Sequence, residues 1–388
     1  MASTKFKYSP KSIAASDPTP APATGKTKVS VTDKLNVWVT DHLTRIPFVL
    51  KMLFVHNLFI MVKAGLSIVD GLRILHAQVE NKRLKKTIAG IKNEVEEGHS
   101  FSEALADYPS VFPSIYVSMI AAGETSGKMQ ESLEQVHIQM KKSHELTSRI
   151  QGAMIYPAVV ITAMTGIGIE MVVFVLPKIL VLFNDFGAEL PLPTRILIAL
   201  VKAIEQYGIF LAVGVIGLAI LAVWLEKKPK IKRQVHALNL KMPIFGAVIQ
   251  KINVARFTMT LSSLLQSAIP IIDAIKITSN VQSNVRFRES LVAVAEVLKK
   301  GVALSDALAE YPNYFPPMVV QMIMVGEQSG QVEQMLGELA AYYSDEVDAT
   351  MRNFSTIIEP VLIVVMGLAV AGMAVAVIMP MYSLAQSF

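Results

Sequence analysis

Long apolar runs without charge alternate along this chain with segments that mix apolar and charged residues. The three runs begin after Arg149, after Glu205 and after Glu359. Each is long enough to supply the roughly 20 helical residues that cross a hydrocarbon core. The pattern therefore predicts three transmembrane helices, at residues 153–177, 206–225 and 357–381.

The segments between these runs have a different pattern. Apolar residues recur there at spacings of three and four, which is typical of amphipathic helices, and the alternation that indicates strands is missing. Composition agrees with a membrane protein, because 52% of the residues are hydrophobic and only 17% are charged. We therefore expect membrane helices joined to helical domains outside the bilayer.

The chain also repeats itself. The phrases "ALADYPSVFP" and "GETSGKM" in the first half correspond to "ALAEYPNYFP" and "GEQSGQV" in the second. Pro113 matches Pro316 and Pro157 matches Pro360, with the same offset of 203 residues and no gap. One unit, made of a helical domain and the transmembrane helix that follows it, has therefore been duplicated in tandem.

The predicted fold class is all-α: a polytopic membrane protein with three transmembrane helices and two homologous cytoplasmic helical-bundle domains. The first residues are rich in Pro, Ala, Ser, Thr and Lys and lack the apolar centre of a secretory signal, so we predict a mobile tail. The predicted segments besides the three spans are the tail at 1–45, the first domain at 46–152, an outer connection at 178–205, the second domain at 226–356 and an outer C-terminal tail at 382–388.

The distribution of cations predicts the orientation in the membrane. "KKSHELTSR" precedes the first predicted span and "EKKPKIKRQ" follows the second, and cationic flanks stay on the cytoplasmic side. We therefore expect a multi-pass protein with a cytoplasmic N-terminus and two cytoplasmic domains. The second basic stretch is expected to meet lipid headgroups, with docking of a specific partner as the alternative.

Helix-start signals occur within the repeated unit. Ser100 is predicted to be the N-cap of a short helix, with Glu103 completing a capping box. In the second copy Ala303 takes the place of that serine, so the box is incomplete there. The two copies are therefore expected to begin this helix differently.

The repeated motif G-E-x-S-G follows the next predicted helix. Gly123 and Gly326 are predicted to end that helix in the left-handed conformation. The pairs that come next, Ser126-Gly127 and Ser329-Gly330, are predicted to begin long helices that run to the membrane.

The glutamate of the motif allows three interpretations. Glu124 and Glu327 could cap neighbouring backbone amides, pair with a cation such as Arg83 or Arg286, or contact a partner protein. None of the motif residues is expected to be catalytic.

Several classes of site are excluded or disfavoured. The chain has no cysteine, which excludes disulfides and thiolate metal sites, and its net charge of +5 is too small to suggest nucleic-acid binding. "GETSGKM" lacks the spacing of a phosphate-binding loop, so any ATP must be hydrolysed by another protein. His137 and His144 alone do not supply enough ligands for a metal. We expect no cofactor, no metal and no enzymatic activity.

The two copies of P-x-x-F-P and G-E-x-S-G around three predicted spans resemble the type II secretion system F family, which includes the platform proteins of type IV pili. The resemblance covers the chain from about residue 50 onward. The N-terminal tail departs from the family pattern. The motif residues carried over are Gly123, Glu124, Ser126 and Gly127 in the first copy and Gly326, Glu327, Ser329 and Gly330 in the second.

The resemblance implies a platform protein in the bacterial inner membrane. Such a protein would couple a hexameric cytoplasmic assembly ATPase to the insertion of pilin or pseudopilin subunits, beside other inner-membrane assembly proteins and as a homo-oligomer. The alternative is a small polytopic transporter, because internal duplication is common in that class as well.

Glu170 is the one charged residue inside the predicted first span, and Met373 occupies the matching place in the third. A carboxylate in lipid is costly and usually faces protein, water or a cation. We therefore predict that Glu170 binds the positively charged N-terminus of a filament subunit, or else lies near the outer interface, protonated or reached by water.

Overall fold

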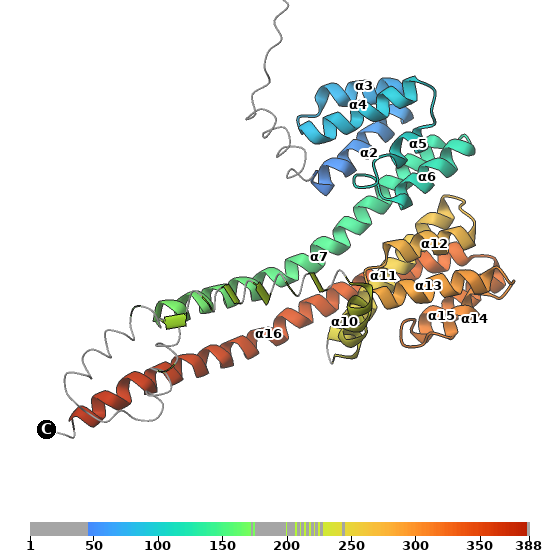
Figure 1. Ribbon diagram of the computed structural model, residues 1–388. Helices are drawn as coiled ribbons and strands as arrows, with labels where there is room; N and C mark the ends of the chain where they lie inside the picture. The colour runs from blue at the N-terminus through green and yellow to red at the C-terminus, as the bar shows by residue number, and fades with distance from the viewer. Residues whose placement is uncertain are drawn as a thin grey trace, which may run out of the picture. The chain divides into compact units, whose positions relative to one another are not determined.

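The computed structural model describes residues 46–171, 228–242 and 245–385, together with scattered positions between 174 and 225 (Figure 1). Regular structure within these ranges is helical, without any strand, which confirms the predicted all-α class. The predicted tail at 1–45, the connection at 178–205 except residue 199, and half of the span at 206–225 lie outside the described residues.

The first copy of the repeat forms five helices that pack around the beginning of a sixth. Figure 1 shows this bundle, in blue to green, at the N-terminal end of the long helix α7. The helices are α2 (Phe48–Lys63), α3 (Ile68–Gln78), α4 (Lys82–Glu96), α5 (Phe101–Ala106), α6 (Ser114–Thr125) and α7 (Met129–Glu170).

The second copy has the same order of helices, preceded by one more. Its helices are α10 (Pro229–Lys241), α11 (Phe245–Gln266), α12 (Ile271–Val281), α13 (Val285–Leu298), α14 (Leu304–Ala309), α15 (Pro317–Ser329) and α16 (Val332–Ala385). Helices α12 and α14 begin and end 203 positions after α3 and α5, which confirms the repeat and its register. Helix α10 packs against α11 and α13.

Each bundle is held by a compact apolar core. In the second copy, the ring centroid of Phe315 lies 5.1 Å from that of Phe257 and 5.7 Å from that of Phe287, and all three rings are buried. In the first copy Phe54 and Phe112 make the equivalent contact at 5.6 Å. Close-packed aromatic pairs of this kind contribute both buried area and a preferred ring geometry.

Two long helices leave these bundles and become apolar on all sides. Helix α7 has 42 residues and α16 has 54. Their later parts expose large apolar side chains, such as Val159 at 62% and Leu368 at 69%. By length and hydropathy, Met129–Glu170 and Val332–Gly372 are both able to cross a bilayer. Residues 153–170 of the first predicted span therefore lie on α7, and the third predicted span, 357–381, lies on α16.

The predicted difference between the two short helices is confirmed. The Ser100 hydroxyl accepts a hydrogen bond from Glu103 N, and the Glu103 carboxylate accepts one from Ser100 N at 3.1 Å. Hydrogen bonds to the carboxylate from the Ser100 hydroxyl and from the Ser100 backbone amide lower the pKa of Glu103 below its usual value. Ala303 begins α14 with nearly the same backbone angles as Ser100 but offers no side-chain cap.

Introducing the missing cap should stabilise the second bundle. We expect Ala303→Ser to raise the free energy of unfolding by about 1 kcal/mol, because the new hydroxyl would accept a bond from the third amide of α14. Thermal unfolding of the full chain in detergent measures this. Ser100→Ala is the matched control and should lower stability by a similar amount. A transition that Ala303→Ser leaves unchanged would contradict the local geometry.

Candidate functional site

The G-E-x-S-G motif of the first copy forms the C-terminal turn of α6. Gly127 has a φ of 69°, in the left-handed region that favours glycine. Lys128 N donates to Gly123 O at 2.7 Å, and Gly127 N donates to Glu124 O at 3.2 Å. This pair of bonds is a Schellman motif, which satisfies carbonyl groups that the end of a helix leaves without partners.

The second copy forms the same turn at the end of α15. Gly330 has a φ of 70°, Gln331 N donates to Gly326 O at 2.7 Å, and Gly330 N donates to Glu327 O at 3.4 Å. The two turns therefore share one backbone conformation, although their surrounding residues differ.

The first glycine of the motif has a different role from the one predicted. Gly123 and Gly326 lie within their helices and are not left-handed, so that prediction was wrong. Each glycine is needed because the following helix approaches it closely. A Cβ added to Gly123 would overlap the side chain of Ser132, and one added to Gly326 would lie 2.9 Å from the Cα of Val332. The glycines let the end of one helix cross the start of the next.

The serine and second glycine of the motif were also misplaced. Ser126 and Gly127 end α6 instead of beginning α7, which starts at Met129. The Ser126 hydroxyl donates to Ala122 O at 2.8 Å.

The second copy repeats this arrangement. The Ser329 hydroxyl donates to Val325 O at 2.8 Å, and Gly330 is the C-cap of α15. The short polar side chain at this position therefore binds the last turn of its own helix, and the long helix begins only afterwards.

The motif glutamates cap a neighbouring helix, which is the first of the three predicted interpretations. The Glu124 carboxylate accepts bonds from Phe101 N at 2.7 Å, Ser102 N at 3.0 Å and the Ser102 hydroxyl at 2.6 Å. These amides are the first two of α5, where a helix leaves its donors without partners and favours negative charge. The glutamate thereby joins the end of α6 to the start of α5.

Glu327 makes the equivalent bonds to α14. Its carboxylate accepts from Leu304 N at 2.6 Å, Ser305 N at 3.1 Å and the Ser305 hydroxyl. Arg286, a cation proposed as an alternative partner, lies 3.7 Å from Glu289 instead. Because Ala303 supplies no cap, α14 depends on Glu327 more than α5 depends on Glu124.

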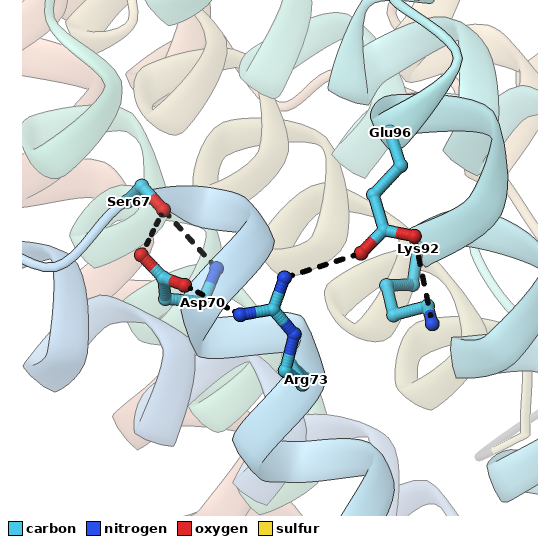
Figure 2. A network of polar contacts seen from close by, with 5 residues as sticks. All are labelled: Ser67, Asp70, Arg73, Lys92 and Glu96. Carbon is cyan, nitrogen blue, oxygen red and sulfur yellow. Dashed lines mark hydrogen bonds and ion pairs between the residues drawn. The ribbon is translucent and has the colours of Figure 1, made fainter.

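A polar cluster on the first bundle joins α3 to α4 (Figure 2). Asp70 accepts a bond from the Ser67 hydroxyl at 2.6 Å and one from Arg73 at 2.9 Å, and Arg73 also lies 3.4 Å from Glu96. Lys92 reaches the same glutamate at 3.6 Å. All these side chains are at least partly exposed, so the cluster shapes the surface charge more than it stabilises the fold.

The sequence gives no local signal for the contact between the two helices, because Arg73 and Glu96 are 23 positions apart. In the second copy, Lys276 and Lys299 occupy the places of Arg73 and Glu96. The equivalent surface therefore carries two cations where the first copy has an ion pair, and the two bundles present different charges.

The remaining candidates lie apart from the motif. Glu170 is the last residue of α7 and is exposed. The ring of His137 lies 4.3 Å from that of His56, whereas His144 stacks on Phe48 at 5.5 Å, so the two predicted histidines do not meet. Within the described ranges, no group of three or more His, Cys, Asp or Glu side chains is placed to hold a metal ion.

Comparison with known proteins matches both copies of this unit. The sequence profile described as "Type II secretion system (T2SS), protein F" matches residues 54–177 and 257–380, with the offset seen in the structure. The chain belongs to this family.

Individual relatives agree over most of the chain. It is 35% identical to the type IV pilus assembly protein PilC of Myxococcus xanthus, over 86% of this chain and 80% of that protein. It is 34% identical to the type II secretion system protein F of Vibrio cholerae, over 84% of this chain and 80% of that protein. The PilC protein of Thermus thermophilus is 32% identical, over 86% and 82% of the two chains.

Removing each motif glutamate tests its capping role. We expect Glu124→Ala and Glu327→Ala to destabilise their short helices by about 1–3 kcal/mol, because partly buried amides lose their acceptor. The loss should be larger at α14. Hydrogen exchange of the amides at 101–106 and 304–309 measures it in the full chain.

Glu97→Ala, at an exposed position, is the control for loss of a carboxylate. It should leave exchange in both helices unchanged. Equal loss of protection in α5 and α14 would contradict the greater dependence of α14 on its glutamate.

Proposed function

We propose that this chain is the inner-membrane platform protein of a type IV pilus or type II secretion machine. In that role it couples a hexameric cytoplasmic assembly ATPase to the insertion of pilin or pseudopilin subunits into the filament, and itself catalyses no reaction. Family membership supports the proposal, as do relatives whose names specify pilus assembly and type II secretion.

The observation that carries the mechanism is the continuity of the long helices. Helix α7 continues from its bundle into an apolar segment with Pro157 inside it, and α16 does the same with Pro360 at the matching position. At 1.5 Å per residue, the 42 residues of α7 span about 63 Å. We propose that a displacement of either bundle on the cytoplasmic side is transmitted along the helix to the bilayer.

The motif turns provide the connection between bundle and long helix. Each turn fixes the angle between two helices through a glycine contact and holds a third helix through the glutamate. Residues 125–128 of the first turn and 328–331 of the second are exposed. We propose that these edges contact the ATPase or other assembly proteins, while the buried parts of the motif keep the long helices aligned.

In this proposal the chain is multi-pass, with its N-terminus and both bundles in the cytoplasm, and works as a homo-oligomer. The basic helix α10 is placed at lipid headgroups. Its exposed Leu238 and the Lys228 ammonium, 4.2 Å from the ring centroid of Trp224, fit such an interface.

Co-purification tests the platform role. Extraction of the tagged full chain in mild detergent should recover the assembly ATPase and pilin-like subunits, and deletion of the gene should abolish filaments. Vesicles that contain only this protein should show no flux of solute. Substrate-dependent flux, with no assembly protein recovered, would favour the transporter alternative.

Glu170 provides a test of subunit handling. We propose that its carboxylate receives the charged N-terminus of a filament subunit, so Glu170→Gln should insert normally yet lower filament yield by about tenfold, the loss expected when about 1.4 kcal/mol of attraction disappears. Surface filaments are measured against membrane-inserted protein. Glu359→Gln, at the acid near the start of the third predicted span, is the matched control. An undiminished yield in the Glu170 variant would remove the assignment.

A further inference from the structure

The two copies of the repeat contact each other inside one chain through a buried polar group. Gln139 of α7 is 2% exposed and lies against α11 of the second copy. Its side-chain oxygen accepts a bond from the Ser263 hydroxyl at 2.7 Å, and its nitrogen donates to the Thr260 hydroxyl at 3.4 Å. One turn earlier, Gln135 and Gln266 line a crevice between the same two helices.

The repeat places an equivalent pair of surfaces elsewhere on the molecule. Helix α16 corresponds to α7, with their first residues in register, and α2 corresponds to α11, with their last residues in register. Tyr342 stands where Gln139 does, and Ile60 stands where Ser263 does. Tyr342 is 45% exposed and Ile60 is 49% exposed. The surfaces of α7 and α11 contact each other, whereas the equivalent surfaces of α16 and α2 are exposed at these positions.

These open counterparts have complementary chemistry. The polar pair Gln139 and Ser263 is replaced on both sides by apolar residues, Tyr342 and Ile60. A polar pair in one position and an apolar pair in the equivalent position would each make a favourable contact, so Tyr342 and Ile60 could pack where Gln139 and Ser263 form a hydrogen bond. A large exposed apolar side chain, Leu53 at 44%, lies two turns before Ile60 and extends the apolar stripe of α2.

A second pair of positions shows the same relation with charge. Glu338 stands in the place of Gln135, and Lys63 stands in the place of Gln266. Both side chains are exposed. Two neutral amides are thus replaced by an anion on α16 and a cation on α2, which would attract each other if the helices met.

We propose that α16 of one chain docks onto α2 of a second copy of this chain, with Tyr342 against Ile60 and Glu338 against Lys63. The contact repeats between chains the packing that joins α7 to α11 within a chain. In a two-fold dimer it forms twice, because each chain presents both surfaces. The inference rests on the homo-oligomer part of the proposed function and assigns residues to it.

Site-specific crosslinking tests the pairing, since the natural chain has no cysteine. Two differently tagged full chains, one with Ile60→Cys and one with Tyr342→Cys, are co-expressed and oxidised in native membranes. A disulfide needs Cα atoms within about 7 Å, so we expect about tenfold more mixed dimer than for Ile60→Cys combined with Val325→Cys. Val325 is 55% exposed on α15. Equal yields from the two combinations would overturn the proposal, whether or not filaments are assembled.

Exchanging the charges of Glu338 and Lys63 tests the second pair. This experiment needs no introduced cysteine and leaves Tyr342 and Ile60 unchanged. Glu338→Lys should lower the dimer fraction in detergent about threefold, the scale of one exposed ion pair, and adding Lys63→Glu in the same chain should restore it. Light scattering measures the fraction. Loss in both variants, or loss in neither, would contradict this contact. A dimer disrupted only by removing lipid would assign the association to the membrane instead.

Discussion

The crossing of two helices at a buried glycine is the constraint on which each bundle depends. At Gly123 and Gly326 the end of one helix approaches the next too closely for any side chain. A left-handed glycine four positions later turns the chain, and the intervening glutamate caps a third helix. The angle at which each long helix leaves its bundle therefore depends on these five adjacent residues.

Duplication placed this unit twice in one chain but did not keep the copies alike. The backbone of the turn is the same, whereas the cap before the short helix, the charge on the surface of Figure 2 and the residues at the contact between copies all differ. Conserved backbone geometry with altered surfaces lets the two bundles serve different neighbours. This difference suits a protein proposed to stand between an ATPase and a row of filament subunits.

The long helices give the bundles a mechanical connection to the bilayer. Their buried residues lie in the bundle, and their later turns expose large apolar side chains at high fractions, as expected of surfaces that face lipid. Each helix contains a proline near the start of its apolar part, Pro157 in α7 and Pro360 in α16. The proposed coupling of bundle movement to the membrane segment would pass through these positions.

The sequence by itself determined the helical class, the apolar parts of the two long helices, the repeat with its register and the capping box at Ser100. These features follow from hydropathy, from internal similarity and from contacts between residues three or four positions apart. Tertiary structure alone decided what the motif residues do. Glu124 binds amides 22 and 23 positions earlier, and Gly123 is needed because Ser132 of another helix lies against it. No local pattern separates a glycine required by its φ from one required by a neighbour, since that distinction exists only after the helices have packed.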